Sequence, residues 1–254
     1  MPNCTFTPLS LFMHLILDVG NTRIKWALFR QRELVYQFDC SPEEFRSLLK
    51  KTRKQYPQVE RILVAATGEL DQKQVKALKD WKKPHWLSHQ SNLPFTNQYQ
   101  TPETLGLDRM GLMAAAALHH PEKNVLVIDA GTCVTYDLLS SDNTYKGGII
   151  SPGLYMRYRS MHRFTAKLPL LQPEVHDQSI GGSTSASMHL GAVGGILMEI
   201  DGFINDYRAQ VDDLTVILTG GDAEFLRDNL KNDIFAHSNF LLEGLNYILE
   251  INPD

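Results

Sequence analysis

The hydrophobic residues fall into short runs separated by polar turns, and this pattern predicts strands followed by helices, twice along the chain. The first run, Leu15 to Leu17, is too short for a helix and stops at Asp18 and Gly20, which is typical of a buried strand and a tight turn. A second strand is expected after Thr22, as the other half of a hairpin. Further strands are predicted over 33–38, 61–65, 85–88, 125–128, 145–150 and 214–218.

Helical spacing predicts the segments between these strands. Ser41 and Glu44, with Pro42 between them, form a capping-box pattern and predict a helix beginning there. One long helix is expected over 184–208, where three glycines (191, 194 and 195) favour close packing against another backbone. Other helices are predicted over 69–81, 106–119, from 153 through 161, and from 240 to the end of the chain. This order of elements indicates α/β units with mixed sheets.

One polar sequence motif occurs twice, with its Asp residues 111 positions apart (129 − 18). Asp18-Val19-Gly20-Asn21-Thr22 and Asp129-Ala130-Gly131-Thr132 each follow an apolar strand and precede another. Glycine lets a ligand approach the main chain closely, and the Asp places a carboxylate where a metal–phosphate complex could bind. The separation is much longer than a solenoid repeat, so it indicates a duplicated domain. We therefore expect domains over 13–120 and 121–254, with residues 1–12 as a disordered extension.

The composition limits the function classes. With 254 residues, 43% of them hydrophobic, the chain can form substantial cores, and its net charge of −4 offers no basic surface for nucleic acid. Three widely spaced cysteines predict neither a disulfide framework nor a zinc cluster, and favour a cytoplasmic location. No apolar run approaches the ~20 residues of a membrane helix. The glycine-rich P-loop signature is absent, which argues against a P-loop enzyme.

A further candidate site is Gly106-Leu107-Asp108-Arg109, which follows a loop containing Tyr99. Such residues can form a helix cap and a surface ion pair. A carboxylate there could also accept a proton from a substrate hydroxyl, while the guanidinium binds a carboxylate or phosphate. Two more glycine-bearing turns, 147–153 and 219–222, follow predicted strands.

The ordered set of motifs resembles type III pantothenate kinase, over about residues 14 to 250. The motifs are Asp18 to Lys25, Gly106 to Arg109, Asp129 to Thr132, Gly148 to Gly153, Ala166 to Pro169, Gly181 to Thr184 and Thr219 to Gly221. That family belongs to the acetate and sugar kinase, Hsp70 and actin superfamily. The resemblance implies two duplicated actin-like (ribonuclease H-like) domains, with mixed sheets flanked by helices and a cleft between the domains.

The resemblance also implies an activity: ATP-dependent phosphorylation of pantothenate to 4'-phosphopantothenate, the first step of coenzyme A biosynthesis. It implies Asp108 as general base, a homodimer, and a monovalent cation (potassium or ammonium) at Asp129; Asp18 is the best candidate to reach Mg²⁺, directly or through water. The implied ATP contacts are Asp18, Val19, Gly20, Asn21, Thr22, Arg23, Ile24, Lys25 and Thr132. The implied substrate contacts are Tyr99, Gly106, Leu107, Asp108, Arg109 and Thr184.

Two other functions stay open on the residues alone. The first is a non-catalytic regulator that binds ATP or pantothenate on the same fold, and the second is a kinase of another small hydroxy acid. Asp108 separates the first from an enzyme, because a binding protein has no need of a base. Arg109 and Tyr99 would suit many carboxylates, so the identity of the substrate rests on the resemblance.

Overall fold

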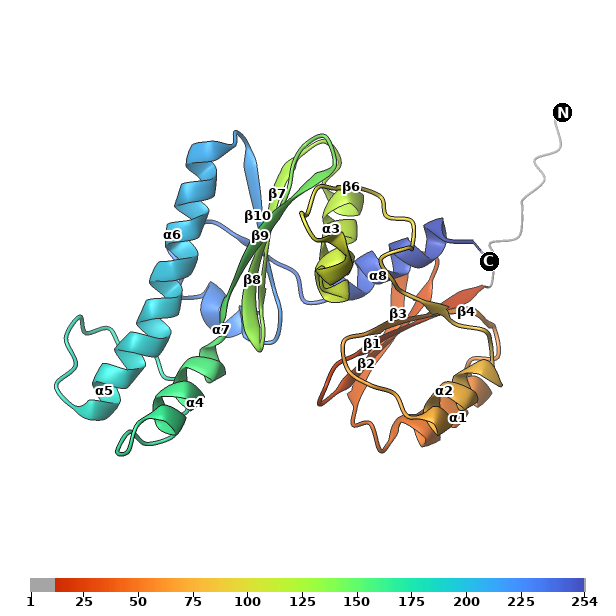
Figure 1. The fold of residues 1–254 in the computed structure, drawn as a ribbon, viewed down its shortest axis with the longest axis horizontal. Coiled ribbons are helices and arrows are strands. Elements are labelled where there is room, and N and C mark those ends of the chain that lie inside the picture. Colours follow the sequence, from red (N-terminus) through yellow and green to blue (C-terminus); the bar gives the residue numbers. More distant parts are fainter. Residues whose placement is uncertain (1–11, 254) are drawn as a thin grey trace, which may run out of the picture. The chain divides into compact units, whose positions relative to one another are not determined.

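The computed structural model describes residues 12–253, so the extension expected over 1–12 lies outside the described residues except for Phe12. Contacts divide the chain into two units (Figure 1). Unit 1 comprises the residues up to Pro94, Thr101–Leu118 and those from Leu241 onward; unit 2 comprises Phe95–Gln100 and His119–Phe240. The division differs from the boundary expected at 120 in two places. Segment 95–100 joins unit 2 because it pairs with a strand there, and the last helix packs on the sheet of unit 1.

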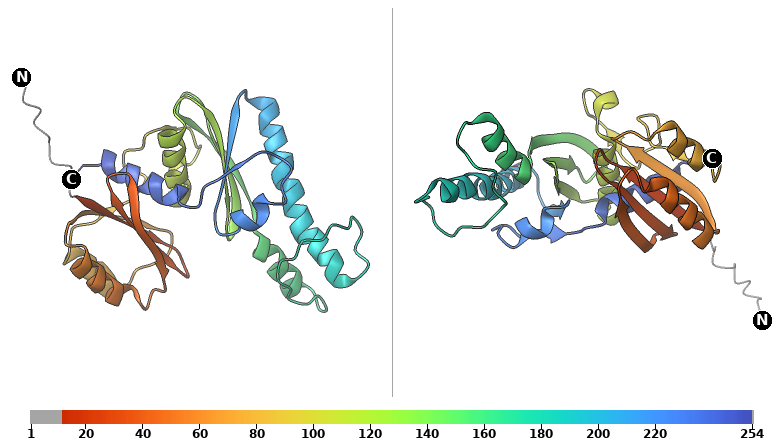
Figure 2. Two further views of the ribbon diagram at one scale, coloured as in Figure 1. Left: turned by 180° about the vertical axis from the view of Figure 1, so that it is seen from behind. Right: turned by 90° about the horizontal axis from the view of Figure 1, so that it is seen from below.

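Unit 1 is built on a five-stranded sheet in the order β3-β2-β1-β4-β5. Its strands are β1 (Met13–Val19), β2 (Ile24–Arg30), β3 (Glu33–Cys40), β4 (Val59–Ala66) and β5 (His85–Trp86). The first three are antiparallel, whereas β4 runs parallel to both β1 and β5. Helices α1 (Phe45–Gln55) and α2 (Gln72–Lys79) cover one face of this sheet, where Phe45, Leu49 and Leu78 enter its core (Figures 1 and 2).

The capping box predicted at Ser41 forms only in part. The main-chain N–H of Ser41 donates to Glu44 Oε2 at 3.0 Å, but α1 begins at Phe45 and has no side-chain cap. Residues 42–44 form a turn because the N–H of Glu44 donates back to the carbonyl of Ser41. The complete box lies at α2, where Asp71 and Gln74 each accept from the other's N–H at 2.7 Å.

Two further helices belong mainly to unit 1: α3 (Leu107–His119), preceded by the 3₁₀ turn η1 (Pro102–Thr104), and α8 (Phe240–Ile251). They approach so closely at Gly111 and Gly244 that a Cβ on Gly244 would lie only 2.8 Å from the main-chain nitrogen of Ala115. Helix α8 also contacts the sheet. Asn246 Oδ1 lies 2.8 Å from Nδ1 of His14 on β1, and Arg61 on β4 donates to the carbonyl of Leu249.

Unit 2 repeats the design of unit 1. Its sheet has the order β11-β10-β7-β8-β9-β6. The strands are β6 (Thr96–Asn97), β7 (Asn124–Ala130), β8 (Cys133–Leu139), β9 (Thr144–Pro152), β10 (Leu214–Thr219) and β11 (Phe235–Ala236). Apart from the added β6, the five strands have the same order and the same directions as those of unit 1. The duplication predicted from the repeated motif is therefore present in the topology.

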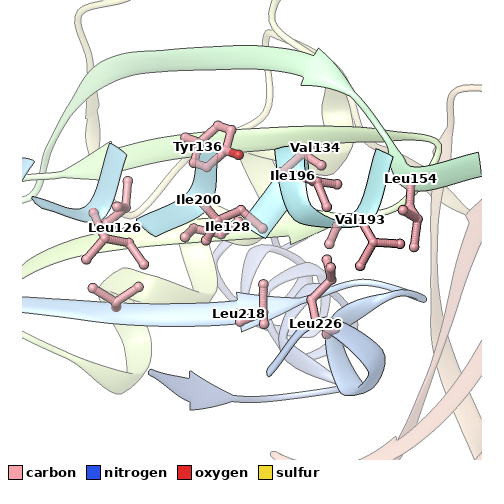
Figure 3. Close-up of a cluster of buried hydrophobic side chains, with 14 of the residues drawn as sticks. Leu126, Ile128, Val134, Tyr136, Leu154, Val193, Ile196, Ile200, Leu218 and Leu226 are labelled. Atoms are coloured by element: carbon pink, nitrogen blue, oxygen red, sulfur yellow. The ribbon is translucent and has the colours of Figure 1, made fainter. Parts of the chain in front are cut away.

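The helices of unit 2 are α4 (Leu154–Phe164), α5 (Thr184–His189), α6 (Gly195–Gln210) and α7 (Ala223–Arg227). Figure 3 shows the core beside α6, where Ile196 and Ile200 lie near Leu126, Ile128 and Tyr136 of the sheet. These side chains are fully or almost fully removed from water, so they supply much of the hydrophobic stabilisation of this unit.

The single helix predicted over 184–208 is interrupted by a π-helical turn, η2 (Leu190–Gly194). Glycine has a low helix propensity, and π turns inside helices are often found near functional sites. The close backbone packing predicted for this segment is not made within the described chain at Gly191 or Gly194, since no atom beyond the adjacent backbone of the same helix lies within 4 Å of a Cβ built there. Among the described helices, none is both long and apolar enough to cross a membrane.

Candidate active site

The first glycine turn lies between β1 and β2 of unit 1. Asp18 is the last residue but one of β1, and it pairs in register with Lys25 of β2 and Ala65 of β4. Its carboxylate lies 3.8 Å from Nζ of Lys25. The N–H of Gly20 donates to the carbonyl of Arg23, which closes the turn. This places a carboxylate and an ammonium group side by side at the strand end, next to a main-chain turn.

The residues predicted to contact ATP in this turn differ in exposure. Asn21, Thr22, Arg23 and Lys25 are exposed, and Asp18 and Gly20 are partly so. Val19 and Ile24 are buried in the core of unit 1, with 1% and 0% of their surface exposed. Those two side chains therefore support the turn, and only their main-chain groups are available to a ligand.

A residue that the sequence analysis missed packs against this turn. Gly68 follows β4, and its N–H and that of Thr67 both donate to the carbonyl of Val19, at 2.8 and 3.0 Å. A Cβ on Gly68 would lie 2.6 Å from the carbonyl carbon of Gly20 and 3.0 Å from the nitrogen of Asn21. Residue 68 must therefore lack a side chain for the turn to hold its position. The sequence signal was present in Thr67-Gly68, a glycine directly after a buried strand.

Asp108 lies in the first turn of α3. Its Oδ1 accepts a hydrogen bond of 2.8 Å from the main-chain N–H of Arg109. Gly106 leaves room for this carboxylate, because a Cβ there would contact the Asp108 side chain. Arg109 is 5% exposed. Leu107, which lies between Gly106 and Asp108 in the chain, is partly exposed.

Asp108, predicted as general base, and Asp18, predicted to contact Mg²⁺-ATP, interact within unit 1. Burial raises the pKa of Asp18 above its ordinary value, the positive charge of Lys25 lowers it, and the negative charge of Asp108 raises it further. Because both residues belong to unit 1, this interaction does not depend on the position of unit 2. A carboxylate whose charge is disfavoured by burial and by a second carboxylate is suited to bind a cation or a proton.

The second glycine turn occupies the corresponding position in unit 2. Asp129 is the last residue but one of β7 and pairs with Thr135 of β8 and Thr219 of β10. The N–H of Gly131 donates to the carbonyl of Cys133 at 3.0 Å. The carbonyl of Thr132 accepts from the N–H of Gly153 at 3.2 Å, so the residue after β9 supports this hairpin. The turn expected over 147–153 is wrong, because residues up to Pro152 pair with β8 as part of β9.

Gly220 packs against the second hairpin as Gly68 does against the first. It has φ +97°, and a Cβ there would lie 2.6 Å from the carbonyl carbon of Ala130 and close to Oδ1 of Asp129. The N–H of Asp222 also donates to the carbonyl of Ala130, at 2.9 Å. Burial raises the pKa of the Asp222 carboxyl. Carboxylate and carbonyl oxygens gather here, and such oxygens are the ligands of hard cations.

The remaining predicted substrate residues lie in unit 2. Tyr99 stacks on Tyr145 of β9, with ring centroids 6.0 Å apart, and its N–H donates to Asn97. Thr184 is the first residue of α5 and is exposed, directly after the N-cap Ser183. Unit 1 thus holds Asp18 to Lys25 and Gly106 to Arg109, whereas unit 2 holds Tyr99, Asp129, Thr132 and Thr184.

Comparison with known proteins identifies the family. The family model described as type III pantothenate kinase matches residues 14–206. A type III pantothenate kinase of Christiangramia forsetii is 47% identical over 240 residues, which cover 94% of this chain and 99% of that protein.

Two solved structures share the fold. A Campylobacter jejuni protein assigned to the Baf family of transcriptional activators has a TM-score of 0.64 at 21% identity, covering 94% of this chain and 98% of its own. A glucokinase from an Antarctic psychrotroph has a TM-score of 0.52 at 12% identity, with coverage of 94% and 98%. These likenesses confirm the expected actin-like fold. The family model and the relative extend over most of the chain, so the chain belongs to the type III pantothenate kinase family.

Proposed function

We propose that the chain is a type III pantothenate kinase, which transfers a phosphoryl group from ATP to the primary hydroxyl of pantothenate and so performs the first step of coenzyme A biosynthesis. The observation that supports it best is that unit 1 holds both carboxylates: Asp18 beside the glycine turn, 3.8 Å from Nζ of Lys25, and Asp108 at the start of α3. The regulator and the kinase of another hydroxy acid are not favoured, because the family model and the close relatives are named as pantothenate kinases.

Phosphoryl transfer depends mainly on positioning and on electrostatic stabilisation of the transferred group. The hydrogen bond from Arg109 N–H engages Oδ1 of Asp108, which leaves Oδ2 to take the proton of the substrate hydroxyl. The buried guanidinium of Arg109 supplies the charge that pairs with the substrate carboxylate. Tyr99, Gly106, Leu107 and Thr184 complete the substrate contacts.

The oxygen groups of the two hairpins fit the ions that this reaction uses. Asp18 is the group to reach Mg²⁺ of ATP, directly or through water, and the ion neutralises charge on the phosphates. The turn from Gly20 to Lys25 and Thr132 contact the nucleotide. Asp129 and the nearby carbonyls hold a potassium or ammonium ion. Asp129→Ala is expected to weaken both the response to potassium and the affinity for ATP, and an unaltered potassium response would contradict this role.

A homodimer is part of the proposal. Of the 13 large hydrophobic side chains that are exposed among the described residues, eight lie between 150 and 198 of unit 2. Ile150, Tyr155, Met156 and Met198 are among them, the last with 78% of its surface exposed. A second copy of the chain would cover such an apolar surface. Light scattering should give twice the chain mass for the wild type, and a monomer would refute this assembly.

We propose that the protein is located in the cytoplasm and that it binds neither nucleic acid nor membrane. Cys40 and Cys133 are both free thiols, which agrees with a reducing compartment.

The decisive experiment is an ADP-release assay with Mg²⁺-ATP, with and without pantothenate and potassium. Pantothenate-dependent release is expected, and Asp108→Asn should lower kcat by about 10²- to 10⁴-fold, the usual contribution of a general base, while ATP still binds. Unchanged turnover of this variant would refute the role of Asp108. No turnover in the wild type, together with thermal stabilisation by ATP, would favour the regulator or another hydroxy acid.

A further inference from the structure

Three potential metal ligands lie together in unit 2, apart from every residue assigned above. They are Glu174 and His176, in the segment between α4 and α5, and His189, the last residue of α5. Their ligand atoms all lie within 4.8 Å of one another. The two imidazole rings are stacked with centroids 5.0 Å apart and an angle of 13°.

The distances suit a small divalent ion. Oε1 of Glu174 lies 3.4 Å from Nε2 of His176, and Oε2 lies 3.9 Å from Nε2 of His189. Two ligands at about 2.1 Å from a tetrahedral zinc ion are about 3.4 Å apart. The Glu174–His176 distance already matches this value, and the Glu174–His189 distance exceeds it by about half an ångström.

The two histidines are arranged as ligands rather than as satisfied hydrogen-bonding groups. Nε2 of His176 is buried and makes no hydrogen bond within the described residues, since Glu174 approaches it without the required geometry. His189 is 6% exposed, and its Nδ1 lies 2.8 Å from the hydroxyl of Tyr158. When Nδ1–H donates to that hydroxyl, the lone pair of Nε2 is free for a metal, and metal-bound histidines usually have such an outer partner.

We propose that Glu174, His176 and His189 form a binding site for a divalent transition metal of the zinc class, which fastens the segment 165–183 to helix α5. This segment contains no helix or strand and exceeds the ~12–15 residues of most unstructured connections (Figure 1). Two ligands come from the segment and one from the helix that begins at Thr184. Two imidazoles and a carboxylate are a ligand set of zinc and related ions, and leave room for water as a fourth ligand.

The site is tested by metal binding on the full chain, after treatment with a chelator and dialysis. Co²⁺ is followed by its visible absorption, and Zn²⁺ by calorimetry and thermal unfolding. We expect one ion per chain, and an increase in Tm of about 5–10 °C when free Zn²⁺ is 100 times its Kd. Absence of binding by the wild type would overturn the proposal.

Variants distinguish metal binding at this site from metal binding by other histidines of the chain. His176→Ala and the nearly isosteric Glu174→Gln should abolish the Co²⁺ spectrum and the Tm increase. Tyr158→Phe keeps the buried ring but removes the hydroxyl, and should weaken the affinity by about 10- to 100-fold. His162→Ala is the matched control, since His162 is exposed on α4 and outside the cluster. Equal binding by His176→Ala and the wild type, or an equal loss in His162→Ala, would overturn the site.

Discussion

Gly68 offers a direct test of how the turn after Asp18 is held. In Gly68→Ala, the new Cβ would lie 2.6 Å from the carbonyl carbon of Gly20, whereas ordinary contacts begin at 3.4 Å. The two main chains must therefore separate by at least 3.4 − 2.6 = 0.8 Å, because the carbonyl oxygen of Gly20 would lie closer still to the Cβ. The atoms that the Cβ would meet belong to the main chain of Gly20 and Asn21, so no flexible side chain can absorb the change. The N–H groups of Thr67 and Gly68 are hydrogen-bonded to the carbonyl of Val19, which holds residue 68 against the turn.

The displacement predicts both a catalytic and a stability effect. A misplacement of about 1 Å in a reacting site can cost about 10²-fold, so kcat/KM for ATP should fall by roughly 10- to 100-fold. Overpacking costs about 1–3 kcal/mol, which corresponds to a decrease in Tm of about 2–12 °C for a chain of this size. Steady-state ADP release at several ATP concentrations, well below the Tm, measures the first effect, and thermal unfolding followed by circular dichroism measures the second.

Gly202→Ala is the matched control. Gly202 lies on α6, and no described atom beyond the adjacent backbone of that helix is within 4 Å of a Cβ built there. The same substitution should leave kcat/KM unchanged and stabilise the helix by up to about 1 kcal/mol. If Gly68→Ala instead retained the kcat/KM of the wild type, the contact between the end of β4 and the first hairpin would have no part in positioning ATP.

Two further predictions concern titrating groups. Asp18→Asn should raise the Tm of the ligand-free protein at neutral pH while lowering activity, because burial and the charge of Asp108 raise the pKa of Asp18 and the ionised native state is penalised. As the pH falls through that raised pKa, Asp18 of the wild type is protonated and also becomes neutral, so the Tm values of the wild type and the variant should converge. Equal Tm values at neutral pH would contradict the reasoning. Tyr136→Phe removes a 2.8 Å hydrogen bond to Glu199 and should cost about 1.5 kcal/mol, or about 3–6 °C in Tm. Burial alone would raise the pKa of Glu199, but hydrogen bonds from Arg157, Ser151 and Tyr136 outweigh burial and lower that pKa. The loss of stability in Tyr136→Phe should therefore be present above the unfolded pKa of about 4.3 and vanish in acid. A difference in Tm that stays constant across pH would refute this reasoning.

The duplicated architecture could be predicted because its signal is local. Asp18 and Asp129 each stand at the end of an apolar run and before a glycine, and these features depend only on neighbours in the chain. The strand directions then follow from the same hairpin in each half. The resemblance that these motifs carry is confirmed by the family match.

The features that escaped prediction depend on contacts between distant segments. Gly68 looks like any turn glycine until β4 pairs with β1 and brings it to Gly20. Periodicity identifies the final helix but does not indicate that it packs on unit 1. Glu174, His176 and His189 follow no recognised ligand spacing, since a segment without regular structure brings the first two to the helix.

The position of α8 has a consequence for synthesis of the protein. Unit 2 contains the continuous stretch His119–Phe240, with Phe95–Gln100 already made, so all of it has been synthesised before α8 is complete. Unit 1 begins the chain but needs α8 to provide Asn246, which is 1% exposed, as the partner of His14. Domains usually complete their folding in order from the N-terminus. Here the first half to be translated is the last to be finished, and a nascent chain can acquire its second hairpin before its first is stabilised.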